Sequence, residues 1–408
     1  MELKKKVLEK LKSHNIILWG RTEQTRYFYE KYGDELHCKA CIAGSDEHPE
    51  YYDMEKKCVP IIKWSDYTYT ENDYIVIFAF PFAPIVNQLQ SYGLCNIENF
   101  VVYNLAYVVL EQKKVVILSG NCHMTVIYQL LSQIEEVREK YFLFHFPTNS
   151  FDNRWAYMNL SYMINLCDFY ICTYHDKNHR AYFEKEELPR KCKIITIPCG
   201  TRELYWPQLE TENNRPKNEF LIRKRGEKRH GPFDCGDLNI NKMIKEGKTL
   251  EEVLERVSAE DFYTKQEVEK HINDIFRQIE EEETFCDIKL LPYIRENYQK
   301  SMLYKDIHMK PMLLWRMVQG ILQILNVKDN EEVLSKVQES QEWKEYCHHC
   351  TEVPVYPSVA KHMGLEWYRK ETTYEVTFYN GTKRLTFEEY IRSYYYVCSR
   401  EYQIMNEW

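Results

Sequence analysis

Apolar runs and amphipathic stretches alternate along the first 112 residues. The apolar runs predict strands, and the stretches with apolar positions three and four apart predict helices. Strands are expected over Asn15–Trp19, Cys38–Ala43, Tyr74–Ala79 and Asn99–Tyr103, with helices over Glu2–Ser13, Glu23–Tyr32 and Pro84–Tyr92. Strands that alternate with helices are typical of a parallel sheet covered by helices. We therefore predict a first α/β unit over residues 1–112.

The turn after the first predicted strand has the sequence GRTEQT and contains one glycine, Gly20. A dinucleotide fingerprint needs three spaced glycines so that the backbone can approach a pyrophosphate. NAD is therefore not expected at this turn. Residues 1–112 are interpreted as a Rossmann-like accessory domain that recognises another ligand or only supports the fold.

The alternation begins again at residue 113. Strands are expected over Lys114–Ser119, Tyr141–Phe144, Phe169–Cys172 and Cys192–Pro198, with helices over Met124–Ile134 and Phe151–Leu166. Residues 201–235 are polar and basic, and we expect a long loop there. The predicted fold class is α/β, with two consecutive Rossmann-like parallel-sheet units over 1–112 and 113–408.

The remaining residues are predicted to extend the second unit with a helical C-terminal region. Three pairs have the spacing of a capping box, namely Thr249 with Glu252, Thr264 with Glu267 and Thr386 with Glu389. Pro311 is expected to begin an apolar helix, and Asn380-Gly381 predicts a hairpin. The Tyr-rich helix after Thr386 is expected to pack in the core or to form the seam of a homo-oligomer.

Composition narrows the class of protein. The 408 residues carry 54 basic and 62 acidic side chains, a net charge of −8, which excludes a generally basic nucleic-acid binder. No apolar run approaches the roughly 18–20 residues that span a bilayer, and the first residues lack the apolar region of a signal peptide. A cytoplasmic protein is therefore expected, with most of its 14 cysteines as buried thiols.

The segment VVILSGNCHMTVIYQLL is the best candidate for chemistry. An apolar strand leads into Gly120, Asn121, Cys122 and His123, and a helix begins at once. Ligands of parallel sheets bind beyond the carboxyl ends of the strands, and a helix N-terminus lowers the pKa of a cysteine. Cys122 is therefore a candidate nucleophile, with the other three as oxyanion-stabilising or substrate-positioning residues. The alternative is a small buried structural cysteine.

A cysteine nucleophile normally needs a base. The segment YKDIHMKP places Asp306 and His308 just before the helix that Pro311 begins. His308 is the candidate base and Asp306 the candidate group that orients it. Because side chains two residues apart often point away from each other, Asp168 and Asp237 are alternatives to Asp306. A surface histidine in a turn is the competing interpretation of His308.

Several segments together resemble the WcbI family of polysaccharide-biosynthesis proteins. They are GNCH after a strand, LCDFYI, GPFDCGDLNINKMIKEGKTLEEV, an RE pair followed by YKDIHMKP, and VPVYPSVAKHMGLEW. The resemblance covers about residues 113–400 and depends on the order and spacing of these segments. Family members usually have GNCQ, where this chain has His123, and they place the histidine in an N-H-P-like stretch.

The resemblance implies a coenzyme-A-dependent acetyl or acyl transfer to a sugar, nucleotide sugar or glycan in capsular or surface-polysaccharide synthesis. Cys122 would attack the thioester of acetyl-coenzyme A, or position it for direct attack by a sugar hydroxyl, with His308 as base. The phosphates of coenzyme A would bind to Arg223, Lys224, Arg225, Arg229 and Arg295. A solvated basic loop is the alternative for the first four residues, and a salt bridge is the alternative for Arg295.

Two other functions stay open. The same turn would support an esterase or deacylase that uses water as the acceptor. The chain would otherwise be a non-catalytic protein that binds a glycan or a nucleotide sugar. A metal is not expected, because four adjacent ligands such as Cys347, His348, His349 and Cys350 do not easily converge on one tetrahedral ion.

Overall fold

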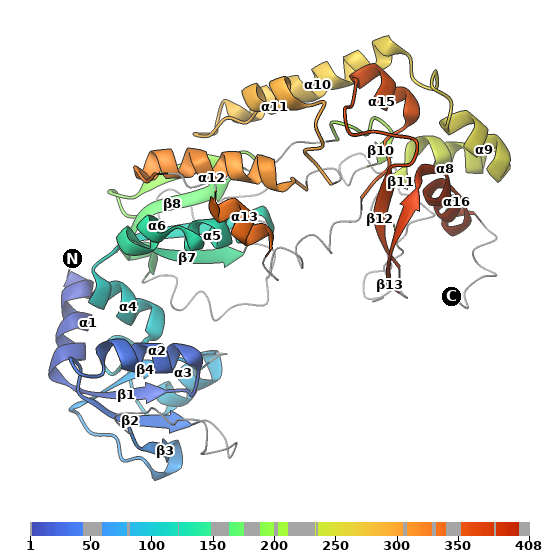
Figure 1. Ribbon diagram of the computed structural model, residues 1–408. Helices are drawn as coiled ribbons and strands as arrows, with labels where there is room; N and C mark the ends of the chain where they lie inside the picture. Colours follow the sequence, from blue (N-terminus) through green and yellow to red (C-terminus); the bar gives the residue numbers. More distant parts are fainter. Residues whose placement is uncertain are drawn as a thin grey trace. The chain divides into compact units, whose positions relative to one another are not determined.

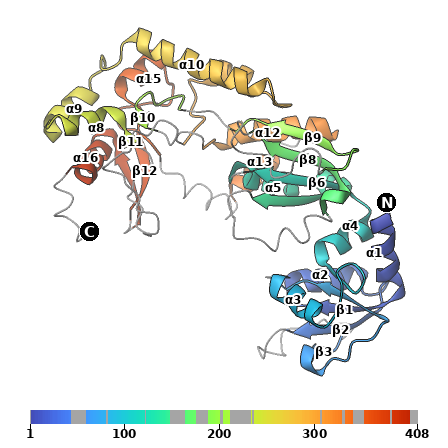
Figure 2. The same ribbon diagram turned by 180° about the vertical axis from the view of Figure 1, so that it is seen from behind.

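The computed structural model describes most of the chain in two compact units (Figures 1 and 2). The described residues are 2–43, 59–79, 82–120, 122–147, 163–174, 188–199, 203–210, 233, 236–304, 308–328, 332–339, 352–378 and 381–399. Unit 1 comprises Met1–Ile117, Arg138–Tyr170 and Phe183–Lys193. Unit 2 comprises Leu118–Val137, Ile171–Tyr182 and Ile194–Trp408.

The first sheet confirms the predicted Rossmann-like unit. Its five parallel strands have the order β3-β2-β1-β4-β5. Their bounds are β1 (Asn15–Trp19), β2 (Cys38–Ala43), β3 (Ile61–Lys63), β4 (Asp73–Ile77) and β5 (Phe100–Val102). The accompanying helices are α1 (Glu2–Ser13), α2 (Glu23–Tyr32), η2 (Trp64–Asp66), α3 (Phe82–Ser91) and α4 (Tyr103–Glu111). The sequence pattern missed β3, which is three residues long and only partly buried.

Continuous apolar runs form these strands because helices cover the sheet on both faces. Ile16, Ile17 and Leu18 in β1 are at most 1% exposed, so successive side chains on opposite faces are all buried. The turn after β1 fits tightly against the neighbouring strand: Gly20 has φ +117°, and a Cβ there would lie 2.5 Å from the backbone nitrogen of Ala79. Only glycine tolerates this conformation.

The second sheet has four strands in the order β7-β6-β8-β9 and is also parallel. The strands are β6 (Lys114–Gly120), β7 (Tyr141–Pro147), β8 (Cys167–Thr173) and β9 (Lys193–Ile197). The helices α5 (Cys122–Gln133) and α6 (Glu135–Lys140) connect β6 to β7. All four strands were expected. The helix expected over Phe151–Leu166 lies mostly outside the described residues, and residues 163–166 of it are helical.

The helical region that follows confirms the predicted extension of the second unit. Its helices are α8 (Leu238–Lys245), α9 (Leu250–Val257), α10 (Lys265–Glu283), α11 (Leu291–Asn297), α12 (Pro311–Leu325), α13 (Glu332–Gln338), α15 (Pro357–Met363) and α16 (Phe387–Cys398). Two small antiparallel ladders join β10 (Leu209–Glu210) to β11 (Gly236–Asp237) and β12 (Thr373–Phe378) to β13 (Gly381–Thr386). The three expected capping boxes, at Thr249, Thr264 and Thr386, are all present. Most of the expected loop over 201–235 lies outside the described residues.

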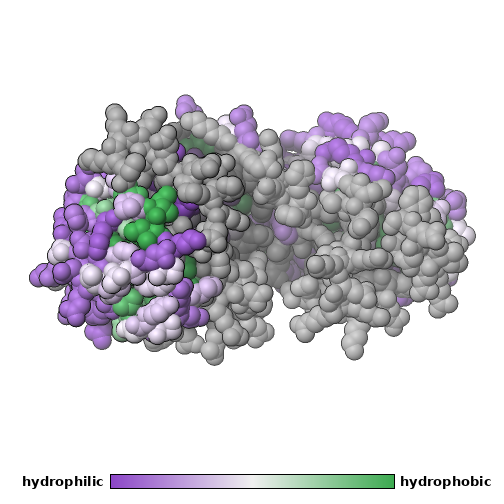
Figure 3. Space-filling model, turned by 90° about the horizontal axis from the view of Figure 1, so that it is seen from below, coloured by the Kyte–Doolittle hydropathy of each residue, from purple (hydrophilic) through white to green (hydrophobic). Residues whose placement is uncertain are grey.

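Apolar side chains are gathered in the cores. Figure 3 shows one face on which the described residues are mostly hydrophilic, with a small apolar area. The Tyr-rich helix α16 buries Tyr390 and Tyr394 against Phe233, as expected for core packing. Several described cysteines are buried free thiols, including Cys41, Cys172 and Cys286. Within the described ranges, no helix combines the length and the apolar character that crossing a membrane requires.

Candidate active site

The order of the second sheet places the GNCH segment at a topological switch point. The first strand of this sheet along the chain, β6, lies between β7 and β8, so the connection from β7 to β8 crosses over it. In sheets of this order, ligands bind at the carboxyl ends of the two strands where the direction of connection reverses. Those two strands are β6, which ends at Gly120, and β8, which ends at Thr173.

Gly120 allows the two strand ends to lie close together. A Cβ at this position would be 3.1 Å from Thr173 Oγ1 and 3.1 Å from Met124 Cβ. Thr173 is 3% exposed, so its hydroxyl is a buried polar group beside the turn. The backbone N–H of the next residue, Tyr174, donates to the carbonyl of Ile197 at the end of β9 (2.7 Å). The carboxyl edge of the sheet is therefore continuous from β6 to β9.

Cys122 is the first residue of α5, two residues after β6 ends. The predicted strand-to-helix turn is therefore present. Cys122 lies in the first turn of α5, where the backbone N–H groups have no hydrogen-bond acceptor within the helix. Such a position favours a thiolate. Asn121 lies outside the described residues, and the side chain of Cys122 is likewise not described.

A hydrogen bond joins this turn to the segment that contains His308. The backbone N–H of Met309 donates to Nε2 of His123 (3.5 Å), and the ring centroids of His123 and His308 are 5.9 Å apart. Because Nε2 accepts this bond, the neutral ring of His123 carries its proton on Nδ1. His123 is 1% exposed, whereas His308 is partly exposed. The structure therefore brings His308 next to the turn, although its neighbour Met309 lies 186 positions after His123 in the sequence.

Helices α5 and α12 run side by side in the same direction. Figures 1 and 2 show α12 beside α5, and the two helices pack against each other. At their beginnings, His123 accepts the bond from Met309; beyond their ends, Glu136 Oε2 accepts the backbone N–H of Lys328 (3.2 Å). Both positive N-terminal ends therefore face the same region, which favours an anion there.

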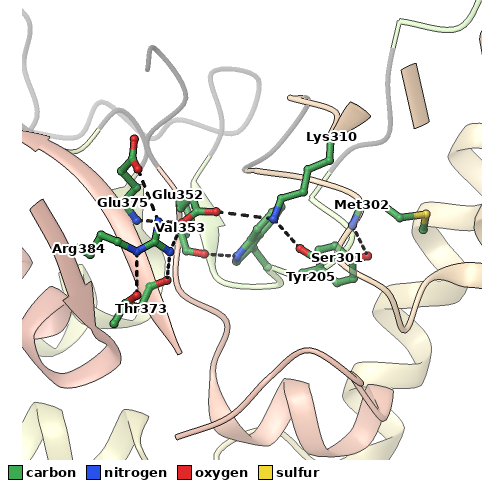
Figure 4. Close-up of polar contacts among 10 residues, drawn as sticks. Tyr205, Ser301, Met302, Lys310, Glu352, Val353, Thr373, Glu375 and Arg384 are labelled. Atoms are coloured by element: carbon green, nitrogen blue, oxygen red, sulfur yellow. Dashed lines mark hydrogen bonds and ion pairs between the residues drawn. The ribbon is translucent and has the colours of Figure 1, made fainter. Parts of the chain in front are cut away.

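The His308 segment is held from its other side by a polar network (Figure 4). Lys310 Nζ donates to Ser301 Oγ (2.7 Å) and lies 3.7 Å from Glu352 Oε1. Glu352 also accepts the backbone N–H of Glu375 in β12 (2.9 Å) and lies 3.9 Å from Arg384 in β13. Lys310 thus ties the segment to the C-terminal hairpin.

Further backbone bonds shape the same segment. The N–H of Lys310 donates to the carbonyl of Met302 (2.8 Å), and the N–H of Tyr304 donates to the carbonyl of His308 (2.8 Å). Trp206 Nε1 donates to the carbonyl of Val353, and the hydroxyl of Tyr205 accepts the N–H of Met302. Buried aromatic side chains therefore hold the chain next to Glu352 and next to Ser301. The position of His308 is therefore defined by backbone as well as side-chain bonds.

Both alternatives to Asp306 have structural roles elsewhere. Asp168 accepts the backbone N–H of Val115 (2.9 Å) and pairs with Lys191 (2.9 Å). Val115 lies at the beginning of β6, about 16 Å along the strand from Gly120. Asp168 therefore lies at the amino ends of the strands, opposite to the candidate site. Asp237 caps α8 and accepts the hydroxyl of Tyr356 (2.8 Å). Asp306 itself lies outside the described residues.

The candidate phosphate-binding residues are only partly described. Arg295 is exposed, pairs with Glu280 (3.1 Å) and lies over the ring of Phe276. The remaining four candidates, Arg223, Lys224, Arg225 and Arg229, lie outside the described residues. The four adjacent Cys and His residues over 347–350, which were considered as metal ligands, also lie outside the described residues.

Sequence reasoning missed Thr173, Lys310 and Glu352. Thr173 had a visible signal, since it is the polar residue that ends the apolar strand LCDFYICT. Lys310 and Glu352 had none, because 42 residues separate them and each stands in an ordinary polar stretch. Their relationship depends on tertiary packing.

The comparisons with known proteins agree with this architecture. The family model described as polysaccharide biosynthesis enzyme WcbI matches residues 115–330, more than half of the chain. This range includes the turn at Gly120 and the His308 segment, and it ends before the expected block at 353–367. A search of curated proteins finds no match.

Among solved structures, one described as WcbI, a novel polysaccharide biosynthesis enzyme, has a TM-score of 0.53 to this chain. It is 15% identical, and the match covers 72% of this chain and 93% of that chain. It is described as the native protein without a disulfide bond between coenzyme A and one of its cysteines. At this identity the similarity shows a shared fold, whereas the family model matches the sequence itself over more than half of its length. The chain therefore belongs to the WcbI family of polysaccharide biosynthesis enzymes.

Proposed function

We propose that this protein transfers an acetyl or other acyl group from coenzyme A to a hydroxyl of a sugar, nucleotide sugar or glycan. The observation that carries the proposal is the position of His308 beside the turn that begins with Gly120 and leads into Cys122. A nucleophile at a helix N-terminus and an imidazole nearby are the parts that acyl transfer through a cysteine needs.

The reaction divides into two steps. The thiolate of Cys122 attacks the thioester carbonyl, and the oxyanion that forms is stabilised by N–H groups at the start of α5 and by Asn121. The thiolate of coenzyme A then leaves and takes the proton that His308 held as an imidazolium, and an acyl-cysteine remains beside the neutral imidazole. In the second step His308 takes the proton of a sugar hydroxyl, the oxygen attacks the acyl-cysteine, and the ester leaves with the thiolate of Cys122 restored. A direct transfer, in which Cys122 only positions the thioester, uses the same base.

The remaining site residues complete the proposal. Asp306 orients the imidazole of His308. Arg223, Lys224, Arg225 and Arg229 bind the phosphates of coenzyme A; Arg295 is paired with Glu280 and is the weaker candidate for that role. The related WcbI structure is described as lacking a disulfide bond between coenzyme A and a cysteine, and this mention of coenzyme A supports the choice of acyl donor. We assign the transferase to residues 113–408 and an accessory role to residues 1–112.

The test is thiol release from acetyl-coenzyme A, measured with and without a panel of sugar acceptors. Cys122→Ser and His308→Gln are each expected to lower kcat/KM by about 10²–10⁴-fold. Cys95→Ser replaces an exposed cysteine of unit 1 and is the matched control that should retain full activity. An unchanged rate in Cys122→Ala would disprove the covalent route. Turnover that does not depend on an acceptor would indicate a hydrolase, and the absence of both coenzyme A binding and turnover would indicate a binding protein.

A further inference from the structure

A groove with a volume of about 900 Å³ lies along the second half of α12, within unit 2. Its floor is apolar, because Ile288, Leu322 and Val327 are buried. Its rim is polar and includes the exposed side chains of Arg316 and Lys328. None of these residues takes part in the acyl transfer proposed above.

The groove has a fixed wall. A Cβ at Gly320 would lie 2.9 Å from Ile288 Cγ2, so the absence of a side chain lets the segment before α11 lie directly on α12. The same segment is bonded to β9, where Asp287 and Thr196 exchange two hydrogen bonds: Asp287 N–H donates to the carbonyl of Thr196 (2.8 Å), and Thr196 N–H donates to Asp287 Oδ2 (2.7 Å). The groove is therefore part of the folded framework.

The charges of the groove favour an anionic ligand. Lys289, Arg316 and Lys328 line it. Lys289 Nζ donates to the carbonyl of Glu283, and its charge also acts on the Glu283 carboxylate. Among the described residues, neither Arg316 nor Lys328 has a carboxylate within 4.0 Å. The two carboxylates that line the groove each accept a backbone N–H, Asp287 from Thr196 and Glu136 from Lys328. A bound anion would therefore meet the charges of Arg316 and Lys328, which no ion pair within the described ranges balances.

The other rim groups suit hydroxyl groups. The guanidinium of Arg316 lies 4.6 Å over the ring of Tyr293 and donates to Gln319 (2.7 Å), which holds its planar fork in one orientation. Gln319 and Gln323 add amides that can both donate to and accept from hydroxyls. A guanidinium fork matches a carboxylate in geometry. We propose that this groove binds a glycan that carries carboxylate groups, such as a chain of uronic acids.

The groove and the candidate active site lie at different positions along the same helix. α12 has 15 residues and is about 22 Å long, and His308 lies just before its first residue. The groove would therefore hold sugar units at a distance from the hydroxyl that reacts. The inference rests on the proposed function in one respect only, that the bound glycan is the acceptor.

The experiment measures the binding of tetragalacturonic acid to the full chain by calorimetry, without any acyl donor. Its methyl ester is the neutral counterpart, and tripolyphosphate is an anion without sugar hydroxyls. We expect Arg316→Gln and Lys328→Gln each to weaken the binding of tetragalacturonic acid about tenfold. Arg277→Gln, which changes an exposed arginine of α10 outside the groove, should bind as the wild type does. Thermal unfolding of each variant verifies that it is folded.

The outcomes separate this inference from the proposed function. Cys122→Ser should bind tetragalacturonic acid as the wild type does even if it transfers no acyl group. Failure of acyl transfer with selective binding intact would refute only the proposed function. Equal binding of the methyl ester, equally tight binding of tripolyphosphate, or an equal loss of affinity in Arg277→Gln would refute the groove as a site for acidic glycans.

Discussion

Nε2 of His123 accepts the backbone N–H of Met309, and this bond connects the helix that begins at Cys122 with the segment that carries His308. The resemblance to the WcbI family implies a glutamine at this position, and the bond indicates what such a side chain would do. A glutamine side chain also carries an acceptor, its Oε1, at a similar distance from the backbone. Either residue can therefore satisfy the buried N–H of Met309.

His123→Gln is accordingly expected to keep the stability within about 0.5 kcal/mol and the activity within a few fold. His123→Leu leaves the N–H of Met309 without its acceptor and should lower the free energy of unfolding by about 1–3 kcal/mol. Urea unfolding at pH 7.5 measures the first quantity, and thiol release from acetyl-coenzyme A measures the second. If Leu and Gln gave equal stabilities, the hydrogen bond would have no structural role.

Lys310 is expected to act as a positioning residue for His308. Lys310→Met removes the contacts to Ser301 and Glu352, so the segment becomes less ordered. We expect kcat to fall about tenfold, which corresponds to about 1.4 kcal/mol, while KM for the acyl donor stays unchanged. The matched control is Lys361→Met, which breaks an exposed ion pair with Glu260 (2.8 Å). Equal kinetic effects in both variants would contradict a positioning role.

Gly120→Ala tests the close approach of β6 and β8. The new Cβ would meet Thr173 Oγ1 and Met124 Cβ at 3.1 Å, and we expect a loss of about 1–3 kcal/mol in the free energy of unfolding. Thr173→Ala removes one of the two obstacles. The double variant should therefore be more stable than the sum of the single changes predicts, by at least about 0.5 kcal/mol. Strict additivity in urea unfolding would show that the two residues do not press on each other.

His145 in β7 predicts a dependence of stability on pH. Burial lowers the pKa of its imidazole to about 4. Because the ordinary value of about 6.5 applies to the unfolded chain, the unfolded state binds the proton first as the pH falls. Stability is complete above pH 6.5 and is lost between about pH 6.5 and 4, by an amount on the order of 3 kcal/mol.

Comparison with His145→Gln isolates this contribution. The variant should lose less stability than the wild type over the same range of pH, since it has no proton to gain. His37→Gln, at an exposed histidine, serves as the control and should follow the wild type. Identical pH profiles for His145→Gln and wild type would show that this residue is not the cause.

The sheet framework could be predicted from the sequence because its signals are local. The bounds of α1, β1, α2 and β2 coincide with the predicted ones, since both strands are mostly apolar and each helix has an apolar face. The capping box at Thr264 depends on two residues three apart and was equally visible. In contrast, β3 has three residues, and its pairing with β2 exists only in the assembled sheet.

The candidate site was predictable only in part. A cysteine after an apolar strand and before a helix is a local pattern, so the location of Cys122 followed from the sequence. His308 was the candidate base from the sequence, but its closeness to His123 could not be established there, because the packing of α12 against α5 decides it. The network of Lys310 and Glu352 is also tertiary, and it had no counterpart in any sequence pattern.

The wide separation of the two halves of the site has a consequence for biosynthesis. Met309 is translated 186 positions after His123, and until then the turn at Cys122 exists without its partner segment. In this interval the turn has neither the backbone N–H of Met309 nor the N-terminal end of α12 beside it. In an unfinished or truncated polypeptide, Nε2 of His123 would therefore lack this donor, and the turn would reach its final packing only once translation has passed α12.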